Sequence, residues 1–213
     1  MEKLFYYFLQ VGRGLGFSLA LLFGGFCIGV ILGTLVAVAR HTRLRFLMER
    51  FVSVIRGTPL ILQLSLTYFV IPGVFGVRPS VMTSGIIAFG INSSAYVAEI
   101  LRAGIESLPK GQFEAAQTLG IPKYYAWKDI ILPQVIANIF PALVNEVISL
   151  LKETSIISVI GGMDIMRRAQ IVAAERFEYF TPLCVAGVCY YILVLLIESI
   201  GKKIEEKFFY AKY

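Results

Sequence analysis

Apolar residues run through this chain in long blocks that are separated by short polar stretches. Five blocks come close to the roughly 20 residues that a helix needs to cross a bilayer. Each block is expected to be a helix, because lipid offers no hydrogen-bond partner to an open strand edge. The predicted spans are residues 15–39, 51–71, 81–101, 135–160 and 183–200. The pattern therefore predicts an all-α integral membrane protein with five transmembrane helices in one domain, residues 1–213.

The composition agrees with a multi-pass membrane protein. Hydrophobic residues make up 57% and charged residues 16% of the 213 positions, and the mean hydropathy is +0.75. A net charge of +6 could indicate a nucleic-acid partner, but the basic residues gather at the ends of the spans, where anionic lipid headgroups lie. We therefore expect a lipid membrane, and no nucleic acid, as the partner of these charges.

Lysine and arginine are divided unequally between the two sides of the predicted membrane. Twelve lie in the 40–50 loop, the 102–128 loop and the C-terminal tail, against seven on the opposite side, and Arg56 falls inside a predicted helix. Short loops rich in positive charge stay in the cytoplasm. The imbalance predicts an N-terminus outside the cell and a C-terminus inside.

Glycine recurs at every fourth position of the first predicted span, as Gly25, Gly29 and Gly33. This spacing leaves one face of a helix without side chains, so that another transmembrane helix can approach its backbone closely. We expect these glycines to pack against a neighbouring helix rather than to take part in chemistry.

The loop between the third and fourth spans, about residues 103–133, is polar and helix-forming. Pro109 suits the start of a helix, and Gly120 followed by Pro122 ends it. Ala115 and Ala116 have side chains small enough for another surface to come close. The loop therefore predicts a short cytoplasmic helix followed by a break.

The spacing of this loop resembles the cytoplasmic signature of bacterial ABC importer permeases. Glu114, Ala115 and Ala116 are followed by three residues and Gly120, and nine more residues precede Ile130. Other stretches match the permeases for histidine, glutamine and arginine uptake, at residues 56–59, 96–102, 111–112 and 152–155. The resemblance covers nearly the whole chain. One departure is Glu153, where that family more often has aspartate.

The resemblance implies a set of partners. The helix that contains Glu114, Ala115, Ala116 and Gly120 would dock into a groove on a cytosolic ATPase subunit. Two such subunits would hold ATP and Mg²⁺, a second permease subunit, identical or a close paralogue, would complete the path, and an extracellular amino-acid-binding protein would deliver the substrate. The implied function is ATP-driven import through the bacterial cell membrane of arginine, lysine, histidine or glutamine. Glu153, with no other buried cation than Lys152 predicted, favours basic amino acids among these.

Polar residues inside the spans are costly in lipid and usually face a cavity, a partner helix or a substrate path. Asn92, Ser93 and Ser94 lie in the middle of the third span and could bind the carboxylate and ammonium of an amino acid. Glu153 could pair with a cationic side chain through two parallel hydrogen bonds. Alternatively, Lys152 and Glu153 neutralise each other or neighbouring residues and merely hold helices together.

The fourth predicted span has one polar face at helical spacing, formed by Asn138, Asn145, Ser149, Lys152 and Glu153. Gln63 and Thr67, four residues apart in the second span, could line the same cavity, although a hydrogen bond between helices explains them equally well. The predicted substrate-binding residues are Asn92, Ser93, Ser94, Glu153, Gln63 and Ser149.

The sequence offers little material for catalysis. It has a single histidine, His41, and its three cysteines lie in apolar spans without metal-ligand spacing. No Gly-rich Walker loop is present, so ATP cannot bind to this chain by that route. We therefore expect no catalytic residues, no metal and no cofactor in the chain, and an energy source on a partner.

Several charged residues remain. Glu99 and Arg102, one helical turn apart, predict a local ion pair, and Arg56 would anchor a helix at the interface or take part in gating. Residues 163–177 predict an amphipathic helix at the outer interface. That helix could be a lid held by lipid, or a platform that forms salt bridges with the binding protein through Asp164, Arg167, Arg168, Glu175 and Glu178.

The alternative function is a secondary transporter that is driven by an ion gradient. Glu146 and Glu153 would then carry protons or sodium ions through the membrane. Such a transporter does not need the Glu114 loop, and no inverted second half is evident in this chain. A structural or signalling scaffold, the third possibility, would not require a polar face along the fourth span.

Overall fold

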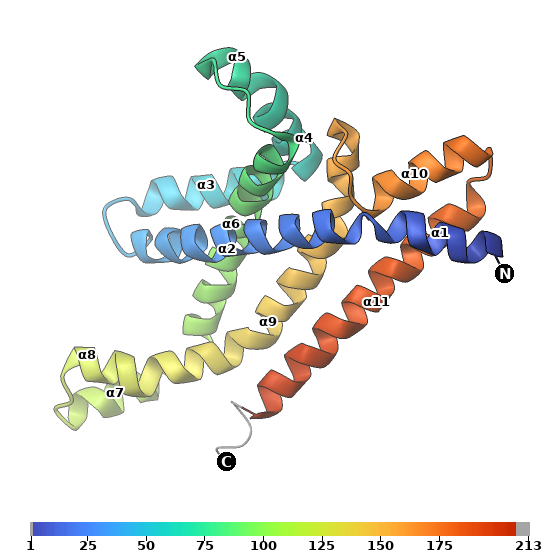
Figure 1. Cartoon of the computed structure of the whole chain (residues 1–213). Helices are drawn as coiled ribbons and strands as arrows, with labels where there is room; N and C mark the ends of the chain where they lie inside the picture. The colour runs from blue at the N-terminus through green and yellow to red at the C-terminus, as the bar shows by residue number, and fades with distance from the viewer. Residues whose placement is uncertain (1, 208–213) are drawn as a thin grey trace.

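The computed structural model describes residues 2–207, and every regular element in that range is helical (Figure 1). Two short segments, η1 and η2, are π-helical, and η3 is a 3₁₀ helix. The elements are α1 (Glu2–Gly12), α2 (Leu15–Ala39), α3 (Arg45–Gly57), α4 (Leu60–Ser65), η1 (Leu66–Val70), α5 (Ile71–Phe75), α6 (Val81–Glu106), α7 (Lys110–Thr118), α8 (Lys123–Tyr125), η2 (Ala126–Ile131), α9 (Leu132–Glu153), η3 (Thr154–Ile160), α10 (Ile165–Arg176) and α11 (Phe180–Glu205).

Four continuous helical segments within the described residues are long and apolar enough to cross a membrane, and a bent pair makes a possible fifth span. The predicted first span coincides with α2. The predicted third and fifth spans lie inside α6 and α11, and the fourth runs through α9 into η3. The apolar blocks therefore located the spanning helices well, whereas α1 was not predicted.

The second predicted span, residues 51–71, is wrong as a single helix. α3 ends at Gly57, and the helical segment Leu60–Phe75 leaves it at an angle of 102°. Thr58 and Pro59 between them are extended, with ψ angles of 143° and 137°. A proline ring disfavours the helical conformation of the residue before it, and proline has no N–H to donate. The break therefore follows from the Thr58–Pro59 pair.

Helices α2 and α6 pack closely at Gly25, Gly29 and Gly33, which confirms the expected role of these glycines. A Cβ atom added to Gly29 would lie 2.7 Å from Cβ of Ser93, and one added to Gly33 would lie 2.8 Å from the carbonyl oxygen of Ser94. No real side chain fits at such distances. The glycines therefore fix the depth at which the polar residues of α6 lie against α2.

We expect Gly29→Val to destabilise the protein strongly. The new side chain would overlap with Ser93, and overpacking of this kind costs about 1–3 kcal/mol or more. Gly16→Val is the matched control, because Gly16 is in the same helix with open space where its Cβ would lie. Thermal unfolding in detergent measures the difference. Equal losses for both variants would contradict close packing at Gly29.

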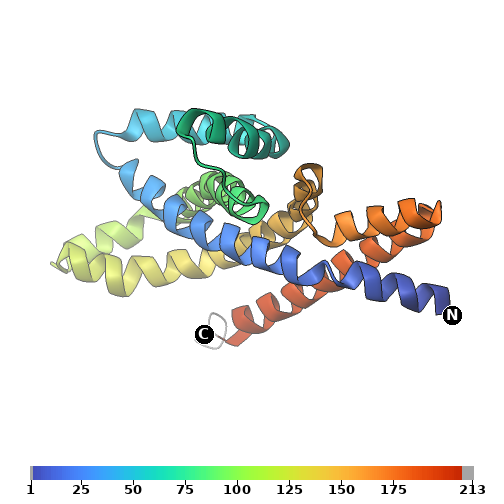
Figure 2. The ribbon, with the colours of Figure 1, turned by 45° about the horizontal axis from the view of Figure 1, so that its top comes forward.

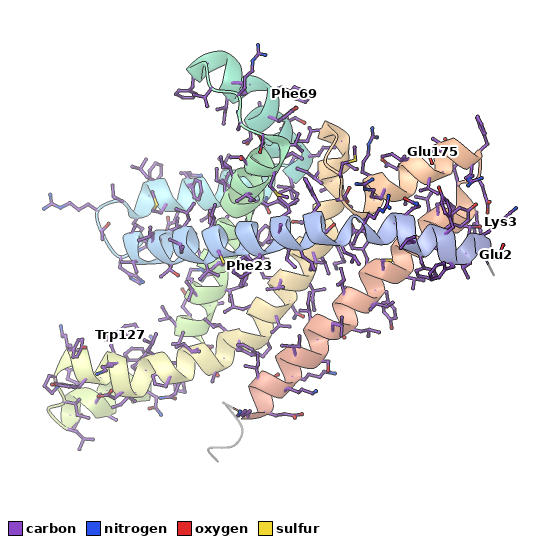
Figure 3. All side chains as sticks on the ribbon, in the orientation of Figure 1. Glu2, Lys3, Phe23, Phe69, Trp127 and Glu175 are labelled. Atoms are coloured by element: carbon purple, nitrogen blue, oxygen red, sulfur yellow. The ribbon has the colours of Figure 1, made fainter. Side chains whose placement is uncertain are left out.

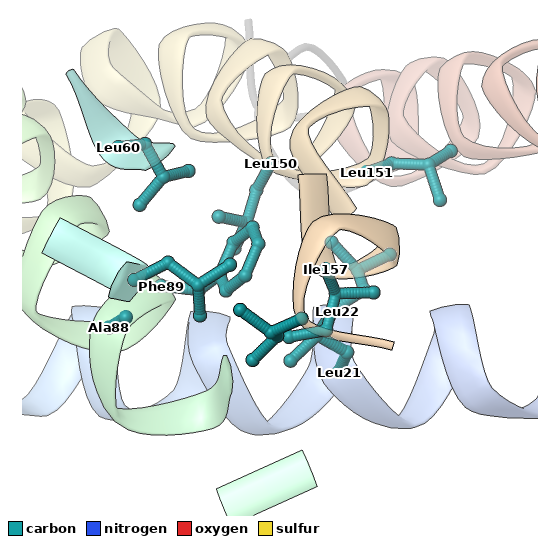
Figure 4. Packing of buried hydrophobic residues seen from close by; sticks show 10 residues of the cluster. Leu21, Leu22, Leu60, Ala88, Phe89, Leu150, Leu151 and Ile157 are labelled. Carbon is teal, nitrogen blue, oxygen red and sulfur yellow. The ribbon is translucent and has the colours of Figure 1, made fainter. Parts of the chain in front are cut away.

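The main buried core lies where α2, α4, α6, α9 and η3 meet (Figure 4). Leu21, Phe89, Leu151 and Ile157 have no exposed surface, and Leu150 is almost fully buried. Burial of side chains of this size contributes roughly 1.5–3 kcal/mol each relative to exposure in water. This core holds α6 against α9 and so sets the position of the polar residues in both helices.

The molecule has two distinct ends (Figures 1 and 2). Helix α1, helix α10 and the start of α11 lie at one end. The α2–α3 connection, the α7–α8 hairpin and the last turn of α11 lie away from it. The basic loops thus lie away from the N-terminus, as the predicted orientation requires; which end faces the cytoplasm stays a prediction. Lys212 of the basic tail lies outside the described residues.

Candidate functional site

A hydrogen bond between two spanning helices joins their polar residues. Ser93 Oγ in α6 donates to Oε1 of Glu146 in α9 at 2.7 Å. Ser93 is buried and Glu146 is half-buried, so the donor compensates part of the cost of a carboxylate in this setting. Glu146 was not among the predicted substrate residues. Its spacing of seven residues from Glu153, which places both on one helix face, is the signal that could have found it.

Gln63 connects the helix break to α6. Its Oε1 accepts a hydrogen bond from Nδ2 of Asn92 at 3.1 Å, and its Nε2 donates to the carbonyl oxygen of Ile55 at 2.8 Å and to Oγ1 of Thr58 at 3.0 Å. The hydroxyl of Thr67 donates to the carbonyl oxygen of Gln63. The expected hydrogen bond between helices is confirmed for Gln63, whereas the hydroxyl of Thr67 bonds within its own helical segment. A role of Gln63 and Asn92 in binding substrate stays a prediction.

Ser94 is fully buried in the interface between α6 and α2. Its hydroxyl donates to the carbonyl oxygen of Ile91 at 2.6 Å, within its own helix. Ser93 and Ser94 therefore both have hydrogen-bond partners inside the chain. Contacts between these two residues and a substrate stay a prediction. They require each hydroxyl to exchange its present hydrogen-bond partner for the substrate.

The polar face predicted for the fourth span exists in α9. Asn138, Asn145, Ser149 and Lys152 are all exposed in the single chain, although α9 belongs to a candidate membrane span. Amide, hydroxyl and ammonium groups are costly against lipid tails. A polar stripe of this length indicates that α9 faces a water-filled path or another protein subunit rather than lipid.

Glu153 is the last residue of α9, half-buried beside the exposed Lys152. Within residues 2–207 no ion pair joins the two side chains. The role of Glu153, in binding substrate or in holding helices together, therefore stays a prediction. Its spacing of seven residues places it on the same face of α9 as Glu146.

Glu99 is the centre of a charge cluster that the sequence revealed only in part. Beside the predicted contact with Arg102, at 2.9 Å, its carboxylate pairs with Arg40 at 2.6 Å and with Arg56 at 3.6 Å. The guanidinium of Arg56 also lies over the ring of Tyr96. The predicted local pair is therefore confirmed, and Arg40, which follows α2, and Arg56, in the last turn of α3, extend it into a cluster. The cluster ties both helices to α6.

We expect Glu99→Gln to lower the free energy of unfolding by about 2 kcal/mol, below the roughly 3–5 kcal/mol typical of a fully buried pair. The amide leaves three guanidinium groups close together, and the side chain of Arg40 is only 11% exposed. Glu106→Gln is the control, because Glu106 is 61% exposed and pairs with Arg102 alone. Unfolding in detergent tests this, and equal stability of the two variants would contradict it.

The loop between α6 and α9 contains the short helix that its sequence predicts. α7 follows Pro109, and Gly120 after it has a left-handed backbone with φ of 68°. The N–H of Ile121 bonds to the carbonyl oxygen of Ala116, and the N–H of Gly120 bonds to that of Gln117. This pair of hydrogen bonds is a Schellman motif, which favours glycine at the left-handed position. Gly120 therefore ends the helix.

The two alanines of this helix face different surroundings. Ala115 is exposed, together with its neighbour Glu114, whereas Ala116 is 4% exposed and packs inside the loop. The expectation that both alanines are open to a partner is therefore wrong for Ala116. Phe113 and Trp127 pack edge to face across the loop and stiffen it. Ala115 is the position at which another surface can come close.

Asp164 does not offer a charge to a partner, contrary to the expectation for the segment 163–177. It is fully buried, its carboxylate caps α10 through the N–H groups of Met166 and Arg167, and it accepts a hydrogen bond from Tyr190. Burial raises the pKa of this carboxyl, and the three hydrogen bonds oppose that rise. The amphipathic helix itself is confirmed as α10, while Glu175 is exposed and Arg168 is half-buried.

These features define a class of protein. Several spanning helices, a polar face inside one of them and a rigid helical loop at one end are the parts of a membrane transport subunit. Among the residues that the structure describes, no group of three His, Cys, Asp or Glu side chains could hold a metal ion.

The chain belongs to the family of binding-protein-dependent transport system inner membrane components, whose model matches residues 29–210. It is therefore a multi-pass membrane permease. It is 52% identical over 182 residues to a putative glutamine transport system permease protein GlnP of Rickettsia conorii, with 84% of each chain covered. It is 43% identical over 198 residues to the arginine transport system permease protein ArtQ of Bacillus subtilis, covering 92% of this chain and 90% of that one.

A solved structure has the same fold. The crystal structure of an amino acid ABC transporter with histidines matches with a TM-score of 0.89 and 38% sequence identity, covering 96% of this chain and 97% of that chain.

Proposed function

We propose that the chain is the permease subunit of an ATP-driven importer of polar amino acids. The observation that carries this proposal is the exposed polar face of α9 inside a candidate span. In the proposed assembly, a second permease subunit, identical or closely related, covers this face, and the translocation path runs between the two. The relatives named for glutamine and arginine transport support an amino acid as the cargo.

The proposed substrate site lies between α6, α9 and the helix break at Thr58 and Pro59. Ser149 is its most accessible member, because it is exposed, and Glu153 is half-buried without an ion-pair partner in the described part of the chain. Asn92, Ser93 and Gln63 would give up hydrogen bonds of the chain when they bind the main-chain groups of an amino acid. The carboxylate of Glu153 favours a cationic side chain, such as that of arginine or lysine.

The proposed coupling element is α7. Its exposed face, with Glu114 and Ala115, docks into a cytosolic ATPase subunit, which holds ATP and Mg²⁺. Closure of two ATPase subunits on ATP moves α7, and the movement reaches α6 and α9 because η2 leads directly into α9. Rigid helices of this kind move together as one body, so a displacement of α7 also displaces the helices that are joined to it. A binding protein would dock at the opposite end, near α10.

Uptake by proteoliposomes tests the proposal against a secondary transporter. Vesicles with the permease, its ATPase and its binding protein receive internal ATP without an ion gradient, or a proton or sodium gradient without ATP. The proposal predicts accumulation of labelled amino acid only with ATP. Accumulation with a gradient alone would instead assign the carboxylates of Glu146 and Glu153 to ion transport.

A further inference from the structure

A surface pocket of about 450 Å³ lies where the start of α1 meets the connection from α10 to α11. Figure 3 shows Glu2 and Lys3 at this end of the molecule, near Glu175 of α10. None of the proposed substrate-binding or ATPase-coupling residues contributes to the pocket. Its lining residues are Glu2, Lys3, Tyr6, Tyr7, Arg176 and Glu178.

The two cations of this pocket have different surroundings: Arg176 stacks on an aromatic ring, and the charge of Lys3 helps to lower the pKa of the Glu178 carboxyl. The guanidinium of Arg176 lies over the ring of Tyr6, 5.1 Å from its centroid. Neither Arg176 nor Lys3 forms an ion pair within residues 2–207. A guanidinium that stacks on an aromatic ring keeps its N–H edge free for an anion, and phosphate fits that edge through two parallel hydrogen bonds.

The negative charge of the pocket, on Glu178, is also held in place by hydrogen bonds. Oε2 of Glu178 accepts a hydrogen bond from the hydroxyl of Tyr7 at 2.8 Å, and its other oxygen accepts one from the hydroxyl of Thr181. These hydroxyls, with Thr181 the stronger influence, lower the pKa of the Glu178 carboxyl. With the exposed Glu2 close by, the pocket holds two cations and two carboxylates. Such a balance suits a ligand that carries both charges.

The surroundings of the pocket are apolar. α1 exposes Leu4, Phe5 and Leu9, and the connection after α10 exposes Phe177 (92%) and Phe180 (81%). A helix with one apolar face and charges at its edge lies at the boundary between headgroups and acyl chains. The continuous segment Glu2–Ala39 has 38 residues, far more than the roughly 20 needed to span a bilayer. α1 therefore extends into the headgroup region.

We propose that this pocket binds the headgroup of a phospholipid that carries a phosphate and a primary ammonium, as in phosphatidylethanolamine. The phosphate pairs with Arg176 and Lys3. The ammonium donates hydrogen bonds to Glu178 and Glu2, and the acyl chains follow the exposed apolar face of α1. Free phosphoethanolamine presents the same charges, but only the lipid uses the apolar surface beside them.

Native mass spectrometry of the delipidated permease tests this site, with dioleoyl phosphatidylethanolamine, phosphatidylglycerol or phosphatidylcholine added. We expect the ethanolamine lipid to bind best, because the glycerol lipid lacks the ammonium and the choline lipid lacks its N–H donors. Arg176→Gln should weaken that binding about tenfold, equivalent to about 1.4 kcal/mol. Arg13→Gln is the matched control, since Arg13 is exposed outside the pocket and bonds to Gln10.

Three results would overturn the assignment. Equal binding of the glycerol and ethanolamine lipids would show that the ammonium is not recognised. If Arg176→Gln binds the lipid as well as the unchanged protein does, with helix content equal to that of the control, the lipid binds outside this pocket. Competition by free phosphoethanolamine or by arginine as strong as that by the lipid would identify a site for a soluble ligand. Each readout is independent of transport, so failure here leaves the proposed function untouched.

Discussion

Replacing Ala115 by tryptophan is expected to abolish assembly of this permease with its ATPase subunit. Ala115 lies on the exposed face of α7, where a large ring would hold the two surfaces apart. Each 1.4 kcal/mol lost from the interface weakens binding about tenfold, and overpacking costs about 1–3 kcal/mol. Co-purification of a tagged permease with the ATPase measures the effect, and uptake should fall with it. Ala116 is unsuitable for this test, because its burial means that a large substitution would disrupt the loop itself.

Ala174→Trp is the matched control for this variant. Ala174 is also an exposed alanine of a short helix, but it is in α10 at the opposite end of the molecule. It should leave ATPase assembly unchanged. Normal co-purification of Ala115→Trp, with wild-type helix content, would contradict the docking of α7.

Replacing Glu153 by glutamine is expected to reduce transport of arginine or lysine much more than transport of glutamine. The carboxylate can form two charge-assisted hydrogen bonds with a guanidinium, and the amide cannot. A hydrogen bond to a charged group contributes about 1.5–3 kcal/mol, which corresponds to roughly a tenfold to hundredfold change in affinity. Stimulation of ATP hydrolysis by each amino acid, over a range of concentrations, measures the difference.

Glu198→Gln serves as the control for Glu153. It removes an exposed carboxylate from α11 instead of α9. Both cargoes should respond to this variant alike. An equal loss for arginine and glutamine in Glu153→Gln would assign Glu153 to helix packing rather than to substrate choice.

The sequence predicted the spanning helices and the loop helix because the interactions that form them are local. Long apolar blocks, the Gly25 to Gly33 spacing and the Gly120 stop each depend on residues close together in the chain. The bend at Thr58 and Pro59 could have been predicted from adjacent residues in the same way. The prediction of a straight span rested instead on the hydrophobicity of the residues on both sides, which suits a straight span and a broken one equally well.

The contacts of the site depend on residues that are far apart in sequence. Arg40 reaches Glu99 across 59 positions, and Ser93 reaches Glu146 across 53. Helical periodicity places each residue on a face but does not say which helix that face meets. Asp164 illustrates this limit: its position before α10 marks an N-cap, but its complete burial arises from Gly14 and Tyr190, which come from other elements.

The most direct test of the account is ATP hydrolysis by this permease, reconstituted in lipid with its ATPase and its binding protein. Arginine, histidine, glutamine or no amino acid is added, and the Ala115→Trp permease is measured in parallel. The account predicts that hydrolysis is stimulated by one or more of the three amino acids and that stimulation is lost in the variant. Hydrolysis that no amino acid changes, together with uptake driven by an ion gradient alone, would contradict it.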